Sequence, residues 1–153
     1  MGHDAYQLMI ELVPASSWGM NLRTMFSKSI WEQLRAFTFN TYAHQCAVCE
    51  KKGSLHCHEV WIYDDENHIQ SLKKLQALCP LCHGIKHIGL SGLQQSGPDM
   101  DQLITHFMKV NQCSRADFTR HYQEQMDMHH KRSRYEWDVT IEGFLEKFEK
   151  EHI

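Results

Sequence analysis

Apolar residues recur at three- and four-residue steps in several parts of the chain, which is the spacing of one face of an α-helix. The series that contains Trp31 and Leu34 predicts a helix that begins after Ser27 or Ser29 and ends near Tyr42. The same spacing predicts three later helices, which run from Pro98 to about Val110, from Ser114 to about His130, and from Thr140 toward the C-terminus.

Alternating apolar and polar residues, which are typical of strands, occupy other stretches of the sequence. Residues Tyr6–Val13 predict a strand that ends at Pro14. Two more strands are predicted at Leu55–Tyr63 and, as a short edge strand, at Trp137–Val139. The segment His68–Leu78 has apolar residues at steps of three, which favours a helix without excluding a strand. Together these elements predict an α+β fold.

Two Cys-x-x-Cys pairs are the strongest chemical signal in the sequence. The pairs are Cys46 with Cys49 and Cys79 with Cys82, and Pro80 favours a turn inside the second pair. Two intervening residues let a tight turn direct both sulfurs to one point, so the two pairs can complete a tetrahedral zinc site of the structural kind. Disulfides or unrelated thiol pairs are the alternative, which a reducing cytosol disfavours.

Three histidines predict a second metal site. If a helix starts at the second cysteine pair, His83 and His87 lie on one of its faces, while Cys82 lies about 100° away. One short helix can then provide a sulfur to the zinc and two imidazoles to a different metal. His58, in the preceding predicted strand, completes the set. A pair of solvated surface histidines is the alternative interpretation of His83 and His87.

These motifs resemble the HNH endonuclease family, in the subtype whose ββα-metal core is braced by two zinc knuckles. Leu55–Val60 is similar to the first strand of that core, and Cys79–His83 is similar to its second knuckle and helix start. A resemblance to small bacterial and phage HNH proteins covers about Leu8 to Trp137, through a Leu-Val-Pro strand end, a His-Glu-Val-Trp strand and a Lys-His-Ile-Gly helix end. The family pattern implies a strand and loop, rather than a helix, before the second knuckle.

The resemblance also implies roles for individual residues. One divalent catalytic metal (Mg²⁺, Mn²⁺, Ni²⁺ or Zn²⁺) would be held by His58, His83 and His87. Glu59 occupies the position where the wider family carries a histidine general base, and Lys74 or a neighbour occupies that of its asparagine. In the alternative register His58 is the base and Cys57 the ligand. A one-residue slip exchanges the two faces of a strand, so these registers exclude each other.

Length and composition indicate one domain with its own core, since the chain has 153 residues of which 42% are hydrophobic. Within this single domain, 1–153, we expect an N-terminal strand and helix in 1–45, the zinc-braced core in 46–90 and a helical extension in 98–153. Trp18 is predicted to fill a gap in the core, with the lining of a groove as the alternative. No apolar run approaches the roughly 20 residues that span a bilayer, and no signal-peptide pattern opens the sequence, so we expect a cytoplasmic protein without membrane contact.

The net charge of −3, counted with neutral histidines, indicates no general attraction for nucleic acid. Phosphate contacts would need a local patch, for which the dense basic run Lys131, Arg132 and Arg134 is the candidate. The predicted function is metal-dependent hydrolysis of phosphodiester bonds, in DNA rather than RNA. The alternatives are a zinc-braced binding or inhibitor protein that does not cleave, and a structural zinc-knuckle interaction domain, which would leave the paired helix histidines unexplained.

Overall fold

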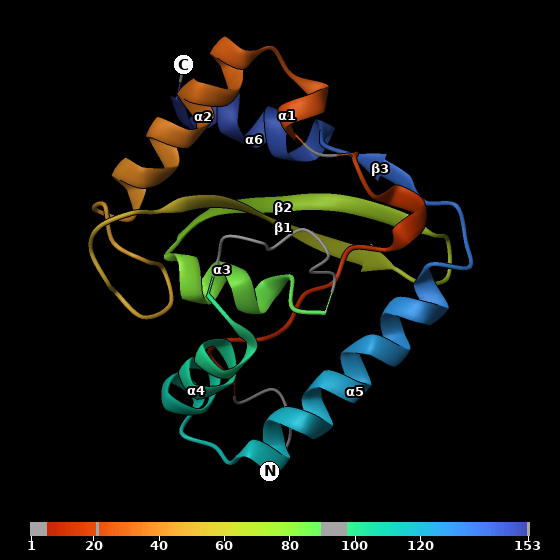
Figure 1. Ribbon diagram of the computed structural model, residues 1–153. Coiled ribbons are helices and arrows are strands. Elements are labelled where there is room, and N and C mark those ends of the chain that lie inside the picture. Colours follow the sequence, from red (N-terminus) through yellow and green to blue (C-terminus); the bar gives the residue numbers. More distant parts are fainter. Residues whose placement is uncertain (1–5, 21, 90–97, 153) are drawn as a thin grey trace.

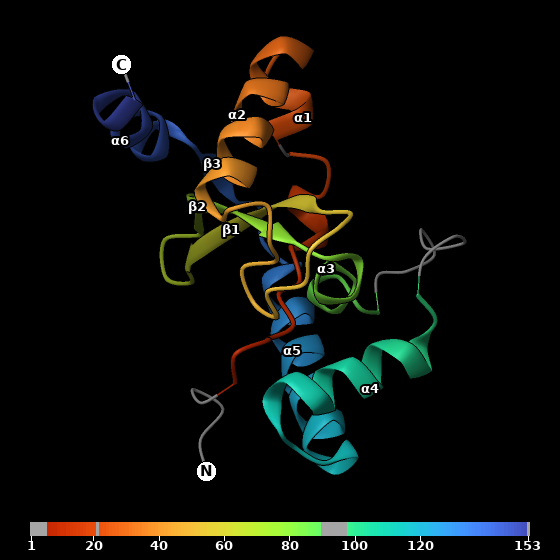
Figure 2. The same cartoon turned by 90° about the vertical axis from the view of Figure 1, so that its left-hand side faces the viewer.

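The computed structural model describes residues 6–20, 22–89 and 98–152. These residues form a mixed α+β fold, as the sequence predicts, with a three-stranded sheet between two groups of helices (Figure 1). One side of the sheet carries α1 (Leu22–Met25), α2 (Lys28–Thr41) and α6 (Glu142–His152). The other side carries α3 (Pro80–Lys86), α4 (Met100–Asn111) and α5 (Arg115–Arg132). Figure 2 shows that α3 lies between the sheet and α4.

The sheet is built around a hairpin of two long strands. Strand β1 (His56–Asp64) pairs antiparallel with β2 (Ile69–Leu78), and β3 (Asp138–Thr140) pairs parallel with the start of β2. The order β1-β2-β3 leaves β1 with a neighbour on one side only among the described residues. Because β1 is an edge strand, side chains from both of its faces can line one pocket at that edge.

The segment that the spacing left ambiguous is the strand β2, and its pairing explains the misleading pattern. Val60 faces Lys74 and Trp61 faces Leu72, so Lys73 is an extra residue in the ladder. Such a bulge shifts the alternation by one residue. Leu72 and Leu75 therefore pack into the same core although they are three residues apart. The bulge thus accounts for the three-residue step from Leu72 to Leu75, whereas Leu78 packs into the core on the other face of the sheet.

The sheet separates two hydrophobic cores. On the side of α2, the core includes Leu34 and Leu75, with Phe148 of α6 packed against them. On the side of α3, a larger core contains Ile85 and the fully buried Phe107 of α4. Helices α2 and α6, from opposite ends of the chain, thus cover one face of the hairpin, and α3 and α4 cover the other, which buries the sheet on both sides.

The predicted helices are present, with start signals close to those in the sequence. Ser27 caps α2, accepting a hydrogen bond from the Ile30 N–H at 3.3 Å. Ser114 caps α5 in a capping box, and Asp99 caps α4 in the same way. The prediction for the last helix is wrong at its cap, because Thr140 ends β3 and α6 begins at Glu142.

The N-terminal segment is extended but is not the predicted strand. Its apolar residues Leu8 and Ile10 are buried, as the alternation indicated. Its backbone groups, however, bond to helix side chains and to the Lys86 carbonyl instead of to another strand. Leu8 exchanges two hydrogen bonds with the Asn111 amide, and the Ile10 N–H donates to Nε2 of His121 at 3.0 Å. These helix side chains satisfy the segment, so it lies beside the sheet without joining it.

Candidate functional site

The two cysteine pairs meet where β2 passes into α3. Cys46 and Cys49 lie on a tight turn that is closed by a hydrogen bond from the Cys46 N–H to the Lys51 carbonyl at 2.9 Å. Cys79 caps α3, and its sulfur accepts a hydrogen bond from the Cys82 N–H. The turn is fixed to β2 by a hydrogen bond from the Ala47 N–H to the Ala77 carbonyl. Local turns and one strand–helix junction therefore bring the sulfurs together.

The distances fit one tetrahedral zinc ion. All four sulfurs lie within 4.8 Å of one another, and Sγ of Cys49 lies 3.6 Å from Sγ of Cys79. Zinc–sulfur bonds of about 2.3 Å place tetrahedral sulfurs about 3.8 Å apart. All six cysteines are free, so the disulfide alternative does not hold in this structure. The four cysteines could therefore hold a zinc ion, as the spacing predicts.

The charges of the thiols also favour a cation. Hydrogen bonds from Cys79 and Cys82 lower the pKa of the Cys46 thiol, while the same contact raises the pKa of Cys79 to about 11. The neighbouring thiols thus stabilise one thiolate, but ionisation of a second thiol is unfavourable unless a positive charge is present. His106 of α4 lies beside the cluster, with Nε2 3.1 Å from Sγ of Cys82. Nothing in the cysteine spacing pointed to this residue.

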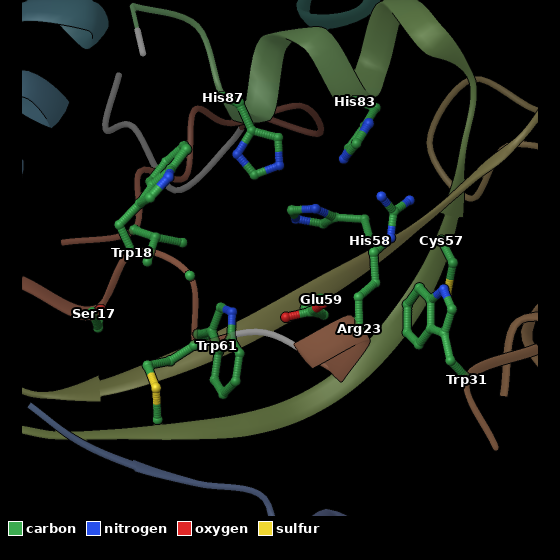
Figure 3. Close-up of a pocket in the computed structure, with 13 residues that line it drawn as sticks. Ser17, Trp18, Arg23, Trp31, Cys57, His58, Glu59, Trp61, His83 and His87 are labelled. Carbon is green, nitrogen blue, oxygen red and sulfur yellow. The ribbon is translucent and has the colours of Figure 1, made fainter. Parts of the chain in front are cut away.

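The three predicted histidines converge on one point. His58 comes from β1, while His83 lies on α3 and His87 follows its last residue. One nitrogen of each lies within 4.8 Å of the others, and the ring centroids are 4.8 to 5.4 Å apart. In Figure 3 the three rings point toward one another across the space between β1 and α3. The strand–helix packing thus brings together the set that the sequence proposed.

Burial keeps two of these imidazoles neutral. Burial and the neighbouring histidines lower the pKa of His83 to about 2 and that of His87 to about 4. Both therefore carry a free lone pair at neutral pH, which is the form that binds a metal. Nδ1 of His87 is buried and has no hydrogen-bond partner. A set of three converging imidazoles, of which His83 and His87 are held neutral, with an orphaned nitrogen fits a divalent transition-metal ion.

Two further residues contact the histidine rings, and no sequence pattern indicated either contact. Nδ1 of His56 lies 2.8 Å from Nδ1 of His83. Glu11 of the N-terminal segment lies 3.1 Å from Nε2 of His58 and forms an ion pair with Lys86. Burial raises the pKa of Glu11, but the hydrogen bond with His58 and the charge of Lys86 outweigh it and lower the pKa to about 2.

Glu59 shares a pocket of about 260 Å³ with the three histidines. It lies on the other face of β1 from His58, and the pocket reaches both faces around the strand edge (Figure 3). Burial raises the pKa of Glu59 to about 7, against the hydrogen bond from the Leu22 N–H and the charge of Arg23. Its carboxylate is therefore poised to exchange a proton near neutral pH, which an exposed glutamate would not be.

Trp18 and Arg23 also line this pocket, and no sequence pattern assigned either residue to it. Trp18 is 49% exposed and lines the pocket, so the prediction that it fills the core is wrong. The short 3₁₀ turn Ala15–Ser17 holds it at the surface. Arg23 of α1 extends toward the histidines in Figure 3, and its charge contributes to the lowered pKa of His83. Its guanidinium provides positive charge beside the metal-ligand set.

The basic run Lys131, Arg132 and Arg134, which was predicted to bind phosphate, does not line the histidine pocket. Arg132 is paired with Asp65 through two hydrogen bonds of 2.8 and 2.9 Å and lies over the ring of Tyr63. Lys131 and Arg134 line a separate pocket together with Arg132. The guanidinium of Arg132 is thus already engaged by a carboxylate, whereas Arg23 lies at the histidine cluster itself.

Lys74, at or near the position of the family's asparagine, lies away from the histidines. It lines a pocket between α2 and α6, with Phe144 and Phe148. The histidine pocket contains neither Lys74 nor its neighbour Lys73.

No family model matches the chain, and neither the curated proteins nor the solved structures contain a significant match. Among the residues that the structure describes, no helix has the length and apolar character to cross a bilayer.

We predict that Cys79→Ser loses bound zinc and much of the stability of the fold. Binding at a structural site contributes on the order of 10 kcal/mol to folding in small zinc domains, and less is expected where a separate core exists. Metal analysis and thermal melting of the purified variant measure both effects. Cys113→Ser, which changes a thiol outside the cluster, should retain one zinc per chain. A zinc-free Cys79→Ser protein with unchanged melting would contradict the assignment.

The raised pKa of Glu59 predicts a pH-dependent cost to stability. The native carboxyl keeps its proton up to about pH 7, whereas the unfolded one loses it near 4.5, so stability falls as the pH rises through this window. Glu59→Gln cannot ionise. The stability of this variant relative to the parent should therefore increase from pH 4.5 to pH 7 and level off above, as measured by urea unfolding. A constant difference would show that Glu59 titrates normally.

Proposed function

We propose that the protein is a metal-dependent endonuclease of the HNH class that hydrolyses phosphodiester bonds in DNA. The observation that carries the proposal is the convergence of three imidazoles in the pocket that also contains Glu59. The strands β1 and β2 and the helix α3 follow one another directly, as in the ββα arrangement that the sequence resembles. His58 comes from the first strand, and the helix segment supplies His83 and His87.

A divalent ion held by these three histidines would supply Lewis-acid stabilisation of the charge that develops on the phosphate and on the leaving 3′ oxygen. The protein residues then have separate tasks. Glu59 accepts a proton from the water that attacks phosphorus, while the bond from phosphorus to the 3′ oxygen breaks and that oxygen takes up a proton from solvent. Arg23 binds a non-bridging phosphate oxygen, since its exposed guanidinium lines the same pocket.

Because β1 is an edge strand, consecutive residues can act in one site, with His58 as a metal ligand and Glu59 as the base. Side chains at consecutive strand positions point to opposite faces, which would separate His58 from Glu59 in the middle of a sheet. Here the pocket wraps around the open edge of β1 and includes both residues. One phosphate at that edge could therefore contact both the histidine site and the carboxylate. This geometry supports Glu59, rather than His58, as the base.

One observation favours the alternative, a zinc-braced binding or inhibitor protein that does not cleave. The position of the family's asparagine is Lys74 or a neighbour, and Lys74 lies in the wall of another pocket. A protein that only binds DNA, however, would not need three converging imidazoles in one pocket with a carboxylate of raised pKa. Cleavage is therefore the proposed function, and DNA binding without nicking would support the alternative.

We predict that His83→Ala abolishes DNA cleavage and binding of the second metal while the cysteine site stays loaded. The loss follows because two imidazoles hold a divalent ion far more weakly than three. Plasmid nicking in Mg²⁺, Mn²⁺, Ni²⁺ and Zn²⁺ measures activity, and circular dichroism with zinc analysis checks the fold. His130→Ala, an exposed histidine of α5, serves as the matched control. Cleavage by His83→Ala at the parent rate would place the active site elsewhere.

For Glu59→Gln we expect a loss of about 10²- to 10⁴-fold in cleavage rate with unchanged occupancy of the histidine site. The parent rate should rise with pH up to about 7, where Glu59 becomes ionised. Glu66→Gln, in the exposed turn between β1 and β2, is the control. If Glu59→Gln cuts normally while His58→Ala is inactive with its metal retained, His58 is the base. An inactive parent in every metal, together with DNA binding, would favour the non-cleaving alternative.

A further inference from the structure

We propose that Glu11 is the positioning residue of His58, holding its imidazole in the one tautomer and orientation that can bind a metal. The inference rests on the metal site proposed above and adds a residue from outside the strand–strand–helix unit. Glu11 belongs to the extended N-terminal segment, 47 positions from His58 in the chain. Nothing in the sequence pattern linked these two residues.

The hydrogen bond decides which nitrogen of His58 is available. Oε2 of Glu11 lies 3.1 Å from Nε2 of His58. An ionised carboxylate only accepts hydrogen bonds, so Nε2 carries the hydrogen and donates it. Nδ1 is then the nitrogen of His58 that has a lone pair. A metal-binding histidine commonly donates its other N–H to a carboxylate, which fixes the tautomer and makes the ligand more basic.

Glu11 is itself held at three points by the end of α3 and by His58. Its Oε1 accepts a hydrogen bond of 2.8 Å from Nζ of Lys86, and its backbone N–H donates to the Lys86 carbonyl at 3.1 Å. Lys86 directly precedes His87 in the chain. The carboxylate is therefore tied to the same helix end that carries another ligand. A shift of the N-terminal segment would therefore displace both His58 and the α3 side of the site.

The burial of Lys86 argues that this ion pair has a role beyond stability. Lys86 is only 4% exposed, and lysine is rarely buried without a specific partner. The Glu11 side chain is 37% exposed, so the pair joins a buried ammonium to a carboxylate at the edge of the core. This contact holds the Glu11 carboxylate in one orientation. Its oxygens are divided, one to the ammonium and one to the imidazole.

The test measures metal affinity, independently of cleavage. Protein with one zinc per chain in the cysteine site is titrated with Ni²⁺ by calorimetry. Glu11→Gln should bind Ni²⁺ about 10- to 100-fold more weakly, because the amide holds the ring less firmly and does not polarise it. Lys86→Met should weaken binding less, and adding it to Glu11→Gln should cause little further loss. Glu32→Gln, an exposed glutamate of α2, should bind like the parent.

The outcomes separate this inference from the proposed function. If the parent and Glu11→Gln bind Ni²⁺ equally while His83→Ala does not bind it, the metal site stands and the role of Glu11 is refuted. If the parent binds no Ni²⁺, the metal site itself fails. Nitrogen-15 spectra of the histidines in the metal-free parent give a measurement that needs no folded variant. They should show His58 protonated at Nε2, and protonation at Nδ1 would overturn the inference.

Discussion

The convergence of four thiols at the junction of β2 and α3 is the constraint on which the rest of the structure depends. It joins the turn of Cys46 and Cys49 to the strand end at Cys79 and to the first helical turn at Cys82. Because α3 begins at this junction, the cluster sets where the helix leaves the sheet. The histidines of α3 then face β1 one turn apart. A metal at the cysteines would therefore stabilise the geometry of a site that it does not touch.

The candidate site also depends on a second feature, the open edge of the sheet. A central strand has a neighbouring strand on each side. Side chains on its two faces are therefore separated by the sheet and lie in different layers of the protein. At the edge strand β1, the pocket includes His58 from one face and Glu59 from the other. Glu59 accepts a hydrogen bond from the Leu22 N–H of α1, whereas His83 and His87 belong to α3 and its C-terminal cap on the other side of the sheet (Figure 1). Two different layers thus tune the two halves of one site.

Chemistry encoded within short stretches could be predicted from the sequence. The cysteine spacing specifies two tight turns, the four-residue step from His83 to His87 specifies one helix face, and Ser27 and Ser114 mark helix starts. Each of these features depends on backbone geometry within a few residues, which is why pattern alone was sufficient. The segment before Cys79 stayed open between a helix and a strand, for a reason that is not local. A bulge at Lys73 shifted the alternation of β2, and bulges are set by the pairing with a partner strand.

Features that depend on distant contacts were decided only by the tertiary structure. Glu11 forms a hydrogen bond with Lys86, 75 positions away in the chain, and no local sequence pattern indicates that contact. The same holds for Arg132, which Asp65 engages from 67 positions away, and for Trp18, which the fold leaves at the pocket rim. A pKa or a side-chain partner reflects the whole surrounding volume, since burial and charge act through space. The sequence by itself therefore determined the ligand types and their local spacing, whereas packing between segments determined which of them are neutral, oriented and close enough to act together.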